Sequence, residues 1–382
     1  MTRILSISIL AGLAATVAAR QAPQPGRLVF IGTYTGPNTN SQGIYAFRFN
    51  DATGTLTPLG LKAETASPSF LAVGGSGRVL YAVNEVDEYK GAKAGSVTSF
   101  AVDAATGGLR ALGVESTGGA APCHVQCDKT GKFVAVANYT GGNIAMFPVG
   151  PDGRLAASSA LLSGTGSGPN KARQQGPHAH QVVFDPTNHF LLEADLGIDR
   201  ILVYRFDRAS GGLTPNDPPS AVVTPGSGPR HLAFHPNGRF VFVINELSST
   251  ITSFAWEGAA GSLRSLGTVS TLPAGHTAEN STAEIAVHPN GRFLYGSNRG
   301  HDSLAVFSVA ADGTLALVEH EPTRGKTPRN FTIDPTGKWL IAANQATGTL
   351  AVFAIDQKTG ALSPAGPLAS VGSPVCVLFW PQ

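Results

Sequence analysis

Short apolar runs separated by polar turns recur along the whole chain. The clearest example spans residues 228–246, where two apolar runs, 230–234 and 239–245, flank the polar stretch His-Pro-Asn-Gly at 235–238. Runs of this length, rich in β-branched and aromatic residues, predict two β-strands joined by a tight turn. No segment shows the apolar spacing of a long helix. The pattern therefore predicts an all-β chain.

The same unit returns six more times with variations, at a spacing of about 40–50 residues, which is typical of propellers and solenoids. The copies align on a turn glycine, as at Gly131 and Gly238, and Asn188 replaces it in one copy. Asn suits that position because it tolerates a positive φ. Each copy continues into a third strand with an aromatic residue and a fourth strand that opens on Leu. Four short strands per repeat predict one blade of a β-propeller.

The two ends of the chain complete the count. Residues 27–59 supply a second, third and fourth strand but no first strand, whereas residues 373–381 supply a first strand alone. Joining them gives a seventh blade, closes the ring and removes the open sheet edges. We therefore expect residues 27–382 to form a single seven-bladed β-propeller domain of four-stranded blades.

The N-terminus has a different character. Residues 1–19 contain one basic residue, Arg3, then an apolar run, and end on the small residue Ala19. This pattern predicts a secretory signal peptide that is removed after Ala19, and the run is too short for a permanent membrane anchor. We expect the mature protein to be exported, either to the periplasm or out of the cell.

Net charge limits the classes of binding partner, and the cysteine positions limit the possible disulfides. The chain has 27 basic and 25 acidic residues, so net charge gives no reason to expect nucleic acid or an anionic membrane as partner. Cys123 and Cys127 lie about 13 Å apart if they share a strand, too far for a disulfide. A bridge from either to Cys376 stays open, and the odd number leaves at least one free thiol. We expect a monomer or a weak dimer.

The repeats suggest chemistry when they are compared position by position. In a propeller, the start of each inner strand and the end of each second strand meet at one rim of the central channel. The first inner-strand positions are Ser69, Cys123, His180, Arg230, Ala283, Arg329 and Val375; the second are Phe70, His124, Gln181, His231, Glu284, Asn330 and Cys376. The residues that follow the second strands are Tyr34, Glu85, Tyr139, Leu196, Glu246, Arg299 and Gln345.

Such a concentration of His, Arg and Glu is costly in a scaffold, because partly buried charges must be paired or used. The channel mouth is therefore the predicted site, although mutual pairing that holds the blades together is an alternative explanation. The Asn or Asp that ends each second strand, as at Asn245, is expected to be structural, because these side chains satisfy backbone groups at turns.

Four segments carry a family resemblance: Gly-Pro-His-Ala-His at 176–180, Gly-Pro-Arg-His-Leu at 228–232, Asn-Glu-Leu-Ser-Ser-Thr at 245–250 and Ser-Asn-Arg-Gly-His at 297–301. Together they resemble the seven-bladed lactonase family, which includes bacterial propeller-type 6-phosphogluconolactonases and the fungal 3-carboxymuconate lactonising enzyme. The resemblance extends over residues 27–382. It implies a site of one His, two Arg and one Glu, matching His178 or His180, Arg230, Glu246 and Arg299.

Opening a lactone by hydrolysis needs a base that activates water and groups that stabilise the developing oxyanion. We expect His180 or Glu246 to be the base, with the other orienting it. Arg230 and Arg299 would bind a carboxylate or the oxyanion, with Arg329 as a further anion contact. The other expected substrate-binding residues are His178, His124, His231 and Glu284.

The resemblance implies a small lactone or carboxylate as partner, here a sugar-acid lactone. The export signal departs from the cytosolic members of the family, and it questions a phosphorylated substrate rather than the lactone chemistry. A muconate-lactonising cyclase and an exported propeller that binds a glycan or a protein are the alternatives. The rim loops 163–175 and 273–281 are either connectors or substrate lids.

No cofactor is predicted. A metal held by His178, His180, His124 and His231 is the competing chemical hypothesis, but no carboxylate-rich cage accompanies these histidines. His124 and His231 also occupy the second inner-strand position, so in a regular strand they point to the face opposite His180.

Overall fold

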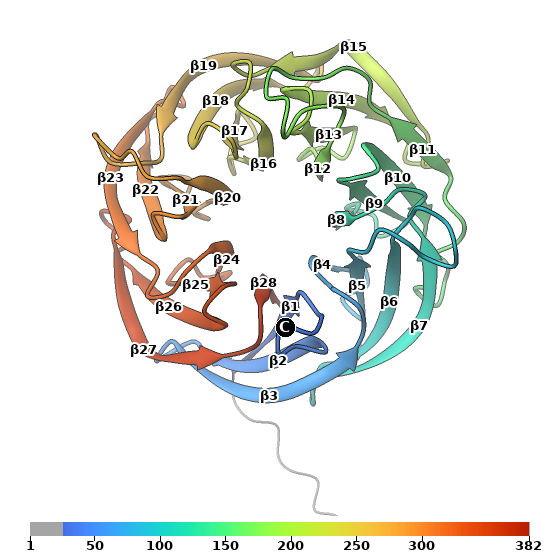
Figure 1. Ribbon diagram of the computed structural model, residues 1–382, viewed down its shortest axis with the longest axis horizontal. Coiled ribbons are helices and arrows are strands. Elements are labelled where there is room, and N and C mark those ends of the chain that lie inside the picture. Colours follow the sequence, from blue (N-terminus) through green and yellow to red (C-terminus); the bar gives the residue numbers. More distant parts are fainter. Residues whose placement is uncertain (1–25, 382) are drawn as a thin grey trace, which may run out of the picture.

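The computed structural model describes residues 26–381, which form 28 β-strands in seven four-stranded antiparallel sheets. The sheets radiate like blades around a central axis, with one strand of each sheet nearest the centre and one at the outer edge (Figure 1). The predicted all-β, seven-bladed propeller is confirmed.

The ring closes as expected. The closing blade has the strand order β28-β1-β2-β3 and joins the two ends of the chain. Its register pairs Ile31 of β1 with Val377 of β28. Its strands are β1 (Arg27–Thr33), β2 (Gly43–Asn50), β3 (Thr55–Glu64) and β28 (Pro374–Phe379).

The other six blades follow one another along the chain. The first three are β4 (Leu71–Val73), β5 (Val79–Asn84), β6 (Ser96–Asp103), β7 (Gly108–Ser116); β8 (Pro122–Cys127), β9 (Phe133–Asn138), β10 (Asn143–Pro148), β11 (Ala160–Ser163); and β12 (Ala179–Phe184), β13 (Phe190–Asp195), β14 (Arg200–Phe206), β15 (Leu213–Val222). The next three are β16 (Pro229–Phe234), β17 (Phe240–Asn245), β18 (Thr250–Glu257), β19 (Ser262–Ser270); β20 (Ser281–Val287), β21 (Phe293–Arg299), β22 (Ser303–Val309), β23 (Leu315–Pro322); and β24 (Pro328–Ile333), β25 (Trp339–Asn344), β26 (Thr349–Ile355), β27 (Leu362–Ser370).

The blades adhere through apolar clusters that lie between neighbouring sheets. Third-strand aromatic residues anchor these clusters, as the repeat pattern predicts: Phe147, Phe254, Phe307 and Phe353 are almost fully buried. Side chains of this size contribute roughly 1.5–3 kcal/mol each when they are removed from water. Packing between blades therefore fixes the radius of the ring.

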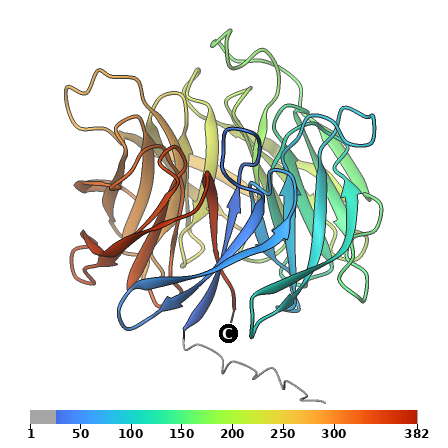
Figure 2. The ribbon, with the colours of Figure 1, turned by 60° about the horizontal axis from the view of Figure 1, so that its bottom comes forward.

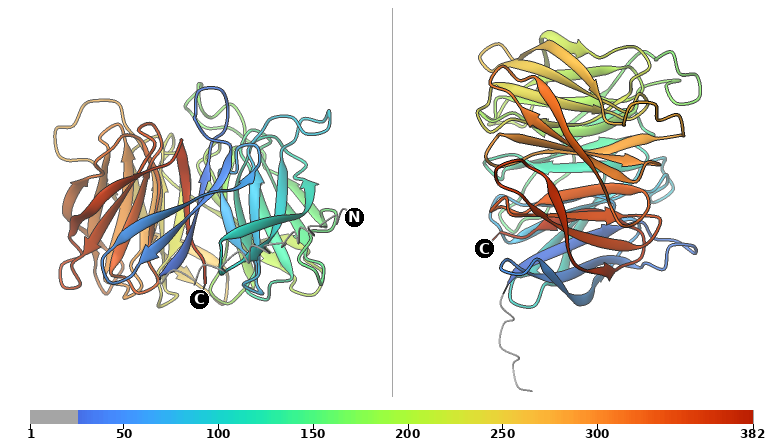
Figure 3. Two further views of the ribbon diagram at one scale, coloured as in Figure 1. Left: turned by 90° about the horizontal axis from the view of Figure 1, so that it is seen from below. Right: turned by 90° about the vertical axis from the view of Figure 1, so that its left-hand side faces the viewer.

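The two faces of the ring differ. The inner strands all begin at one face, where the second strands end, and the β1–β2 loop rises from that face (Figures 2 and 3). The C-terminus lies at the opposite face (Figure 3). The face on which the inner strands begin is called the pocket face below.

Six of the seven inner strands are irregular near their first residues. The register shifts between Pro122 and His124, between Ala179 and Gln181, and between Pro229 and His231, and β20, β24 and β28 show the same irregularity. A β-bulge inserts an extra residue and re-aims the side chains beside it. The bulged positions are those of the first inner-strand set, which includes His180.

The residue that ends each second strand has the expected structural role. Nδ2 of Asn84 donates to the carbonyl of Ala66 (2.7 Å), and Nδ2 of Asn298 donates to that of Thr271 (2.8 Å). These bonds tie the connection that enters a blade to the second strand of that blade. The predicted positive φ at Asn188 is also confirmed, at 61°.

Some expectations concern other parts of the chain. The expected signal peptide, residues 1–19, lies outside the described residues. Within residues 26–381, no helix is long and apolar enough to cross a membrane. Cys123, Cys127 and Cys376 are all free in the structure.

The sequence pattern does not single out Glu193, yet this acid is fully buried in β13. Its Oε2 accepts a hydrogen bond from the Tyr204 hydroxyl (2.9 Å), and its Oε1 has no partner among the described residues. Burial, with a smaller contribution from Asp195, raises the pKa of Glu193 to about 8. The side chain is therefore protonated in the folded protein at neutral pH.

This burial predicts a pH-dependent stability. Between pH 4.5 and 8 the unfolded chain loses the Glu193 proton while the folded chain keeps it, so stability falls as pH rises. We expect Glu193→Gln to remove this loss, on the order of 1 kcal/mol per pH unit. Melting temperatures of the variant and the parent should be similar near pH 5 and diverge in favour of the variant by pH 8. A constant difference, matching that of exposed Glu257→Gln, would contradict the assignment.

Candidate active site

A pocket of about 360 Å³ opens at the centre of the pocket face. Residues from all seven blades and one loop line it: Tyr34, Glu85, Cys123, Tyr139, Arg173, His180, Glu246, Ser281, Arg299 and Arg329. Inner-strand bulges provide Cys123, His180 and Arg329, whereas Tyr34, Glu85, Tyr139 and Glu246 each follow the last residue of the second strand of a blade. Ring closure thus places residues almost 300 positions apart in sequence around one opening.

Glu246 is the electrostatic centre of this pocket. Its Oε1 lies 2.6 Å from Nη2 of Arg173, and its Oε2 lies 3.0 Å from Nε of Arg230 and 2.9 Å from Nη2 of Arg299. Burial disfavours the charged carboxylate, but Arg299, Arg230 and Arg173 outweigh it and lower the pKa of Glu246 to about 2. Glu246 is therefore a permanent anion that positions three guanidinium groups.

The arginines differ in how many hydrogen bonds and ion pairs they form within the protein. Arg230 is 2% exposed, and besides Glu246 its Nη1 donates to the Ala283 carbonyl (2.7 Å). Arg299 likewise donates to the Thr282 carbonyl (2.7 Å). Arg329 lies over the ring of Tyr34, with its guanidinium carbon 5.0 Å from the ring centroid, and forms no hydrogen bond or ion pair with a described residue. Arg329 is thus the guanidinium most available to a ligand.

His180 is a neutral imidazole in the pocket wall. Its side chain is 4% exposed, and burial, followed by the charge of Arg230, lowers its pKa well below the ordinary value. Nδ1 has no hydrogen-bond partner among the residues that the structure describes. A neutral ring carries one lone pair and one N–H, so His180 can accept a proton on one nitrogen while the other nitrogen donates a hydrogen bond.

The other three predicted histidines lie in two different places. His178 precedes β12, and its ring stacks on Tyr139 with 4.6 Å between centroids, so it supports a pocket residue from behind. His124 and His231 lie below the pocket, where the ring of His231 is 5.5 Å from that of His124 and 5.1 Å from that of His180. The expectation that they point away from His180 is wrong, because the bulge interrupts the alternation of a regular strand.

Glu284 lies at the same lower level as His231. Its Oε1 is 3.0 Å from Nδ1 of His231, and its Oε2 accepts from the side-chain amide of Asn330. Among the predicted site residues, His180, Glu246, Arg299 and Arg329 therefore line the pocket itself, and Arg230, His231 and Glu284 lie directly beneath it.

Several pocket residues were not predicted as site residues. Tyr34, Glu85 and Tyr139 belong to the position that follows a strand end, which the repeat alignment identifies as rich in polar residues. Arg173 comes from the rim loop 163–175, where no repeat indicates its direction. Gln174 fixes this loop through bonds to the Leu196 carbonyl and the Asp199 carboxylate, both 2.8 Å. The loop is therefore anchored, with Arg173 reaching into the pocket.

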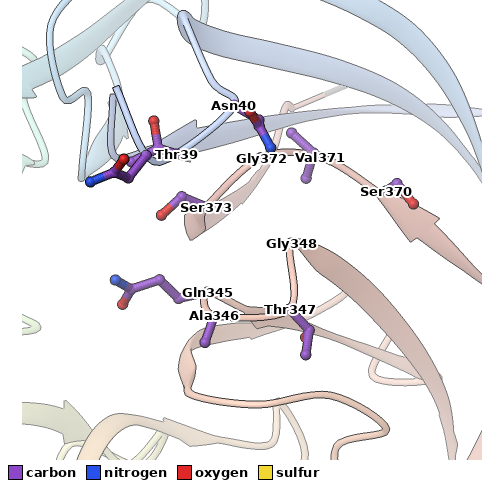
Figure 4. Close-up of a pocket in the computed structure, with 11 residues that line it drawn as sticks. Thr39, Asn40, Gln345, Ala346, Thr347, Gly348, Ser370, Val371, Gly372 and Ser373 are labelled. Atoms are coloured by element: carbon purple, nitrogen blue, oxygen red, sulfur yellow. The ribbon is translucent and has the colours of Figure 1, made fainter. Parts of the chain in front are cut away.

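A second, larger pocket lies between the closing blade and the blade of β24–β27 (Figure 4). Its volume is about 680 Å³, and segments 38–40, 345–348 and 370–373 line it. None of these residues is ionisable, so the lining offers no acid, base or charged anchor. The chemistry of the pocket face lies in the central pocket instead.

A metal centre receives no geometric support. Within residues 26–381, no group of three or more His, Cys, Asp or Glu side chains is arranged to hold a metal ion.

Fold and pocket together define a seven-bladed propeller with a cationic pocket at its hub. The family described as "Lactonase, 7-bladed beta-propeller" matches residues 28–379, and the chain belongs to this family. A 6-phosphogluconolactonase of Bacillus subtilis (strain 168) is 37% identical over 354 residues, covering 92% of this chain and 98% of the relative.

Two further relatives extend the comparison. A 6-phosphogluconolactonase of Formosa agariphila is 35% identical, covering 79% of this chain and 85% of the relative. The solved structure of the Pseudomonas aeruginosa periplasmic gluconolactonase superposes with a TM-score of 0.87 at 35% identity, covering 93% of this chain and 99% of that chain. These matches confirm the family that the four motifs indicated.

The arginine cluster predicts a large effect of removing its anion. Glu246→Gln leaves three arginines facing each other without a counter-charge, and breaking such a buried pair typically costs about 3–5 kcal/mol. Arg173→Ala should cost less than about 1 kcal/mol, because Arg173 is half-exposed. Thermal unfolding measures both.

Phosphate provides the internal control for this pair of variants. An added anion can replace the lost carboxylate, so phosphate should raise the melting temperature of Glu246→Gln more than that of the parent. Equal effects of the two substitutions would contradict the central role of Glu246.

Proposed function

We propose that the protein is a lactone hydrolase that opens a sugar-acid lactone in the central pocket. One observation carries the proposal: Arg329, whose guanidinium forms no hydrogen bond or ion pair with a described residue, and the neutral imidazole of His180 line the same pocket. The relatives of the chain are named 6-phosphogluconolactonase and gluconolactonase. An anion site beside a proton-transfer group is the minimum that lactone hydrolysis requires.

The positive charge acts on the oxyanion and on anionic substituents of the substrate. Four arginines face three glutamates in this region, so positive charge is in excess, and low-dielectric walls strengthen its effect. Arg329 makes the first contact with the ligand. Arg299 and Arg173, already oriented by Glu246, complete the cationic wall, while deeply buried Arg230 holds Glu246 in place.

Hydrolysis also needs two proton transfers, one from water and one to the departing ring oxygen. Of the two groups considered from the sequence, Glu246 is a poor base, because its pKa of about 2 means that it holds a proton weakly. His180 is the remaining group, and it relays a proton to the departing ring oxygen through the lone pair and the N–H of its neutral ring, which burial keeps uncharged by lowering its pKa.

The proposed location is outside the cytoplasm, from the N-terminal pattern at residues 1–19. The Pseudomonas relative is named as periplasmic, which agrees with this proposal. Because the Pseudomonas relative is named gluconolactonase, glucono-type lactones are the first substrates to test, with 6-phosphogluconolactone beside them. A non-catalytic binding platform is not favoured, because the relatives are named as enzymes.

Two substitutions test the two roles. His180→Ala should lower kcat/KM by roughly 10²- to 10⁴-fold, mainly through kcat, as expected for loss of a proton-transfer group. Arg329→Met should mainly raise KM, by about 10-fold or more, because a charge-assisted contact to the ligand is lost. Initial rates on D-glucono-lactone and 6-phosphogluconolactone measure both.

Arg324→Met, which changes an exposed arginine just before β24, is the matched control and should leave the rates unchanged. Parent-like turnover in both His180→Ala and Arg329→Met would refute the proposed roles. No turnover of either lactone by the parent protein would refute the function itself.

A further inference from the structure

Below the floor of the pocket lies a small chamber. Its volume is about 10 Å³, close to the smallest space that holds one water molecule. Glu85, Cys123 and Arg329 line both spaces, so the chamber adjoins the pocket floor. Ser69 and His231 line the chamber from the inner strands.

Three polar atoms of the chamber lining lack partners. The hydroxyl of Ser69, Oε2 of Glu85 and Nε2 of His231 are each buried, with no hydrogen bond to any described residue. Ser69 is 4% exposed and His231 is 1% exposed. Buried polar groups are costly without partners, and a water with two to four such neighbours is the usual solution.

The state of His231 follows from its neighbour. Because Oε1 of Glu284 accepts from Nδ1–H of His231, the lone pair of a neutral ring lies on Nε2, the unpartnered atom. Asn330 holds Glu284 from the other side, and its own Oδ1 accepts from the Val377 backbone (2.8 Å). The chamber therefore contains a fixed imidazole acceptor.

Glu85 supplies a second acceptor, and it differs from Glu246. Its Oε1 accepts from the Tyr34 hydroxyl (2.8 Å), which leaves Oε2 for another donor. No arginine or lysine among the described residues lies within ion-pair distance of Glu85, whereas three arginines occupy Glu246. Oε2 of Glu85 is therefore open to a hydrogen-bond donor that the described residues do not supply.

We propose that this chamber binds the hydrolytic water, and that Glu85 is the catalytic base that takes its proton. This inference rests on the proposed lactone hydrolysis. The water donates its two hydrogens to Oε2 of Glu85 and Nε2 of His231 and accepts one from the Ser69 hydroxyl. Its remaining lone pair then faces the pocket floor, where the lactone carbonyl lies.

The chemistry balances without a further reactant. As the water oxygen bonds to the carbonyl carbon, one O–H bond breaks and that proton passes to Glu85, while the oxyanion faces Arg329. The bond from the carbonyl carbon to the ring oxygen then breaks. The proton moves from Glu85 through His180 to the ring oxygen, and a hydroxy acid leaves with both side chains restored.

The principal test is Glu85→Gln, assayed on whichever lactone the parent protein hydrolyses. We expect kcat to fall by roughly 10²- to 10⁴-fold with KM changed less than about threefold, because a base is lost and the anion site stays. Formate should partly restore the rate of Glu85→Ala by replacing the missing carboxylate. Glu88→Gln, an exposed acid three residues further on, is the matched control and should match the parent.

Glu284 is a positioning residue, and its variant has a distinct signature. Glu284 raises the pKa of His231 against the larger effect of burial, so Glu284→Gln should lower that pKa. The acid limb of the kcat/KM–pH profile should then move to lower pH. A purely structural role would lower the melting temperature and leave the profile in place.

The outcomes separate this inference from the proposed function. Inactivity of the parent protein on all lactones overturns the function. An active parent with Glu85→Gln within threefold of it overturns the base, even where the variant is less stable. If Glu85→Gln fails to fold, a high-resolution crystal structure of the parent decides: a water bonded to Ser69, Glu85 and His231 supports the site, and a dry chamber overturns it.

Discussion

The antiparallel pairing of β28 with β1 holds the chain in a closed ring, and the pocket depends on that closure. Seven inner strands must start at the same rim once the ring is closed, and six of them carry an irregularity near that point. A flat or open sheet with the same strands would distribute these starts along an edge. Closure instead concentrates the six irregular strand starts on a small area.

The concentration of charge then determines the electrostatics. Placing Arg173, Arg230 and Arg299 together would be unfavourable without Glu246, and Glu246 would be unfavourable in this buried place without them. The arginine side chains are therefore already ordered in the folded protein, so binding a ligand does not require them to reorient. Arg329, held only by the face of Tyr34, keeps its hydrogen-bonding capacity for the ligand.

Polar groups are also layered by depth along the central axis. The pocket holds the charged wall and His180, and the chamber below it holds unpartnered polar atoms beside Phe70, against which His124 packs. The three glutamates of this region therefore have different binding partners. Both carboxylate oxygens of Glu246 bind arginines, and Glu284 binds His231. Oε2 of Glu85 has no hydrogen-bond partner among the described residues.

Much of this could be predicted from sequence because propeller repeats are strictly periodic. The turn glycines and strand-end asparagines locate each blade, so the pairing of Arg230 with Glu246 on one blade was foreseeable from their spacing. The direction of His231 was not, because a bulge breaks the two-residue alternation on which the prediction relied. Arg173 was out of reach for another reason, since its loop belongs to no repeat.

The sequence by itself determined the seven blades, the closure by the chain ends, the lactonase family and the set of polar residues at the rim. These follow from local patterns, each of which lies within a few tens of residues. Only the tertiary structure decided which carboxylate is paired with arginines and which keeps an unpartnered oxygen, because that depends on contacts between blades. Side-chain depth and partner choice are properties of the assembled ring, and no local pattern encodes them.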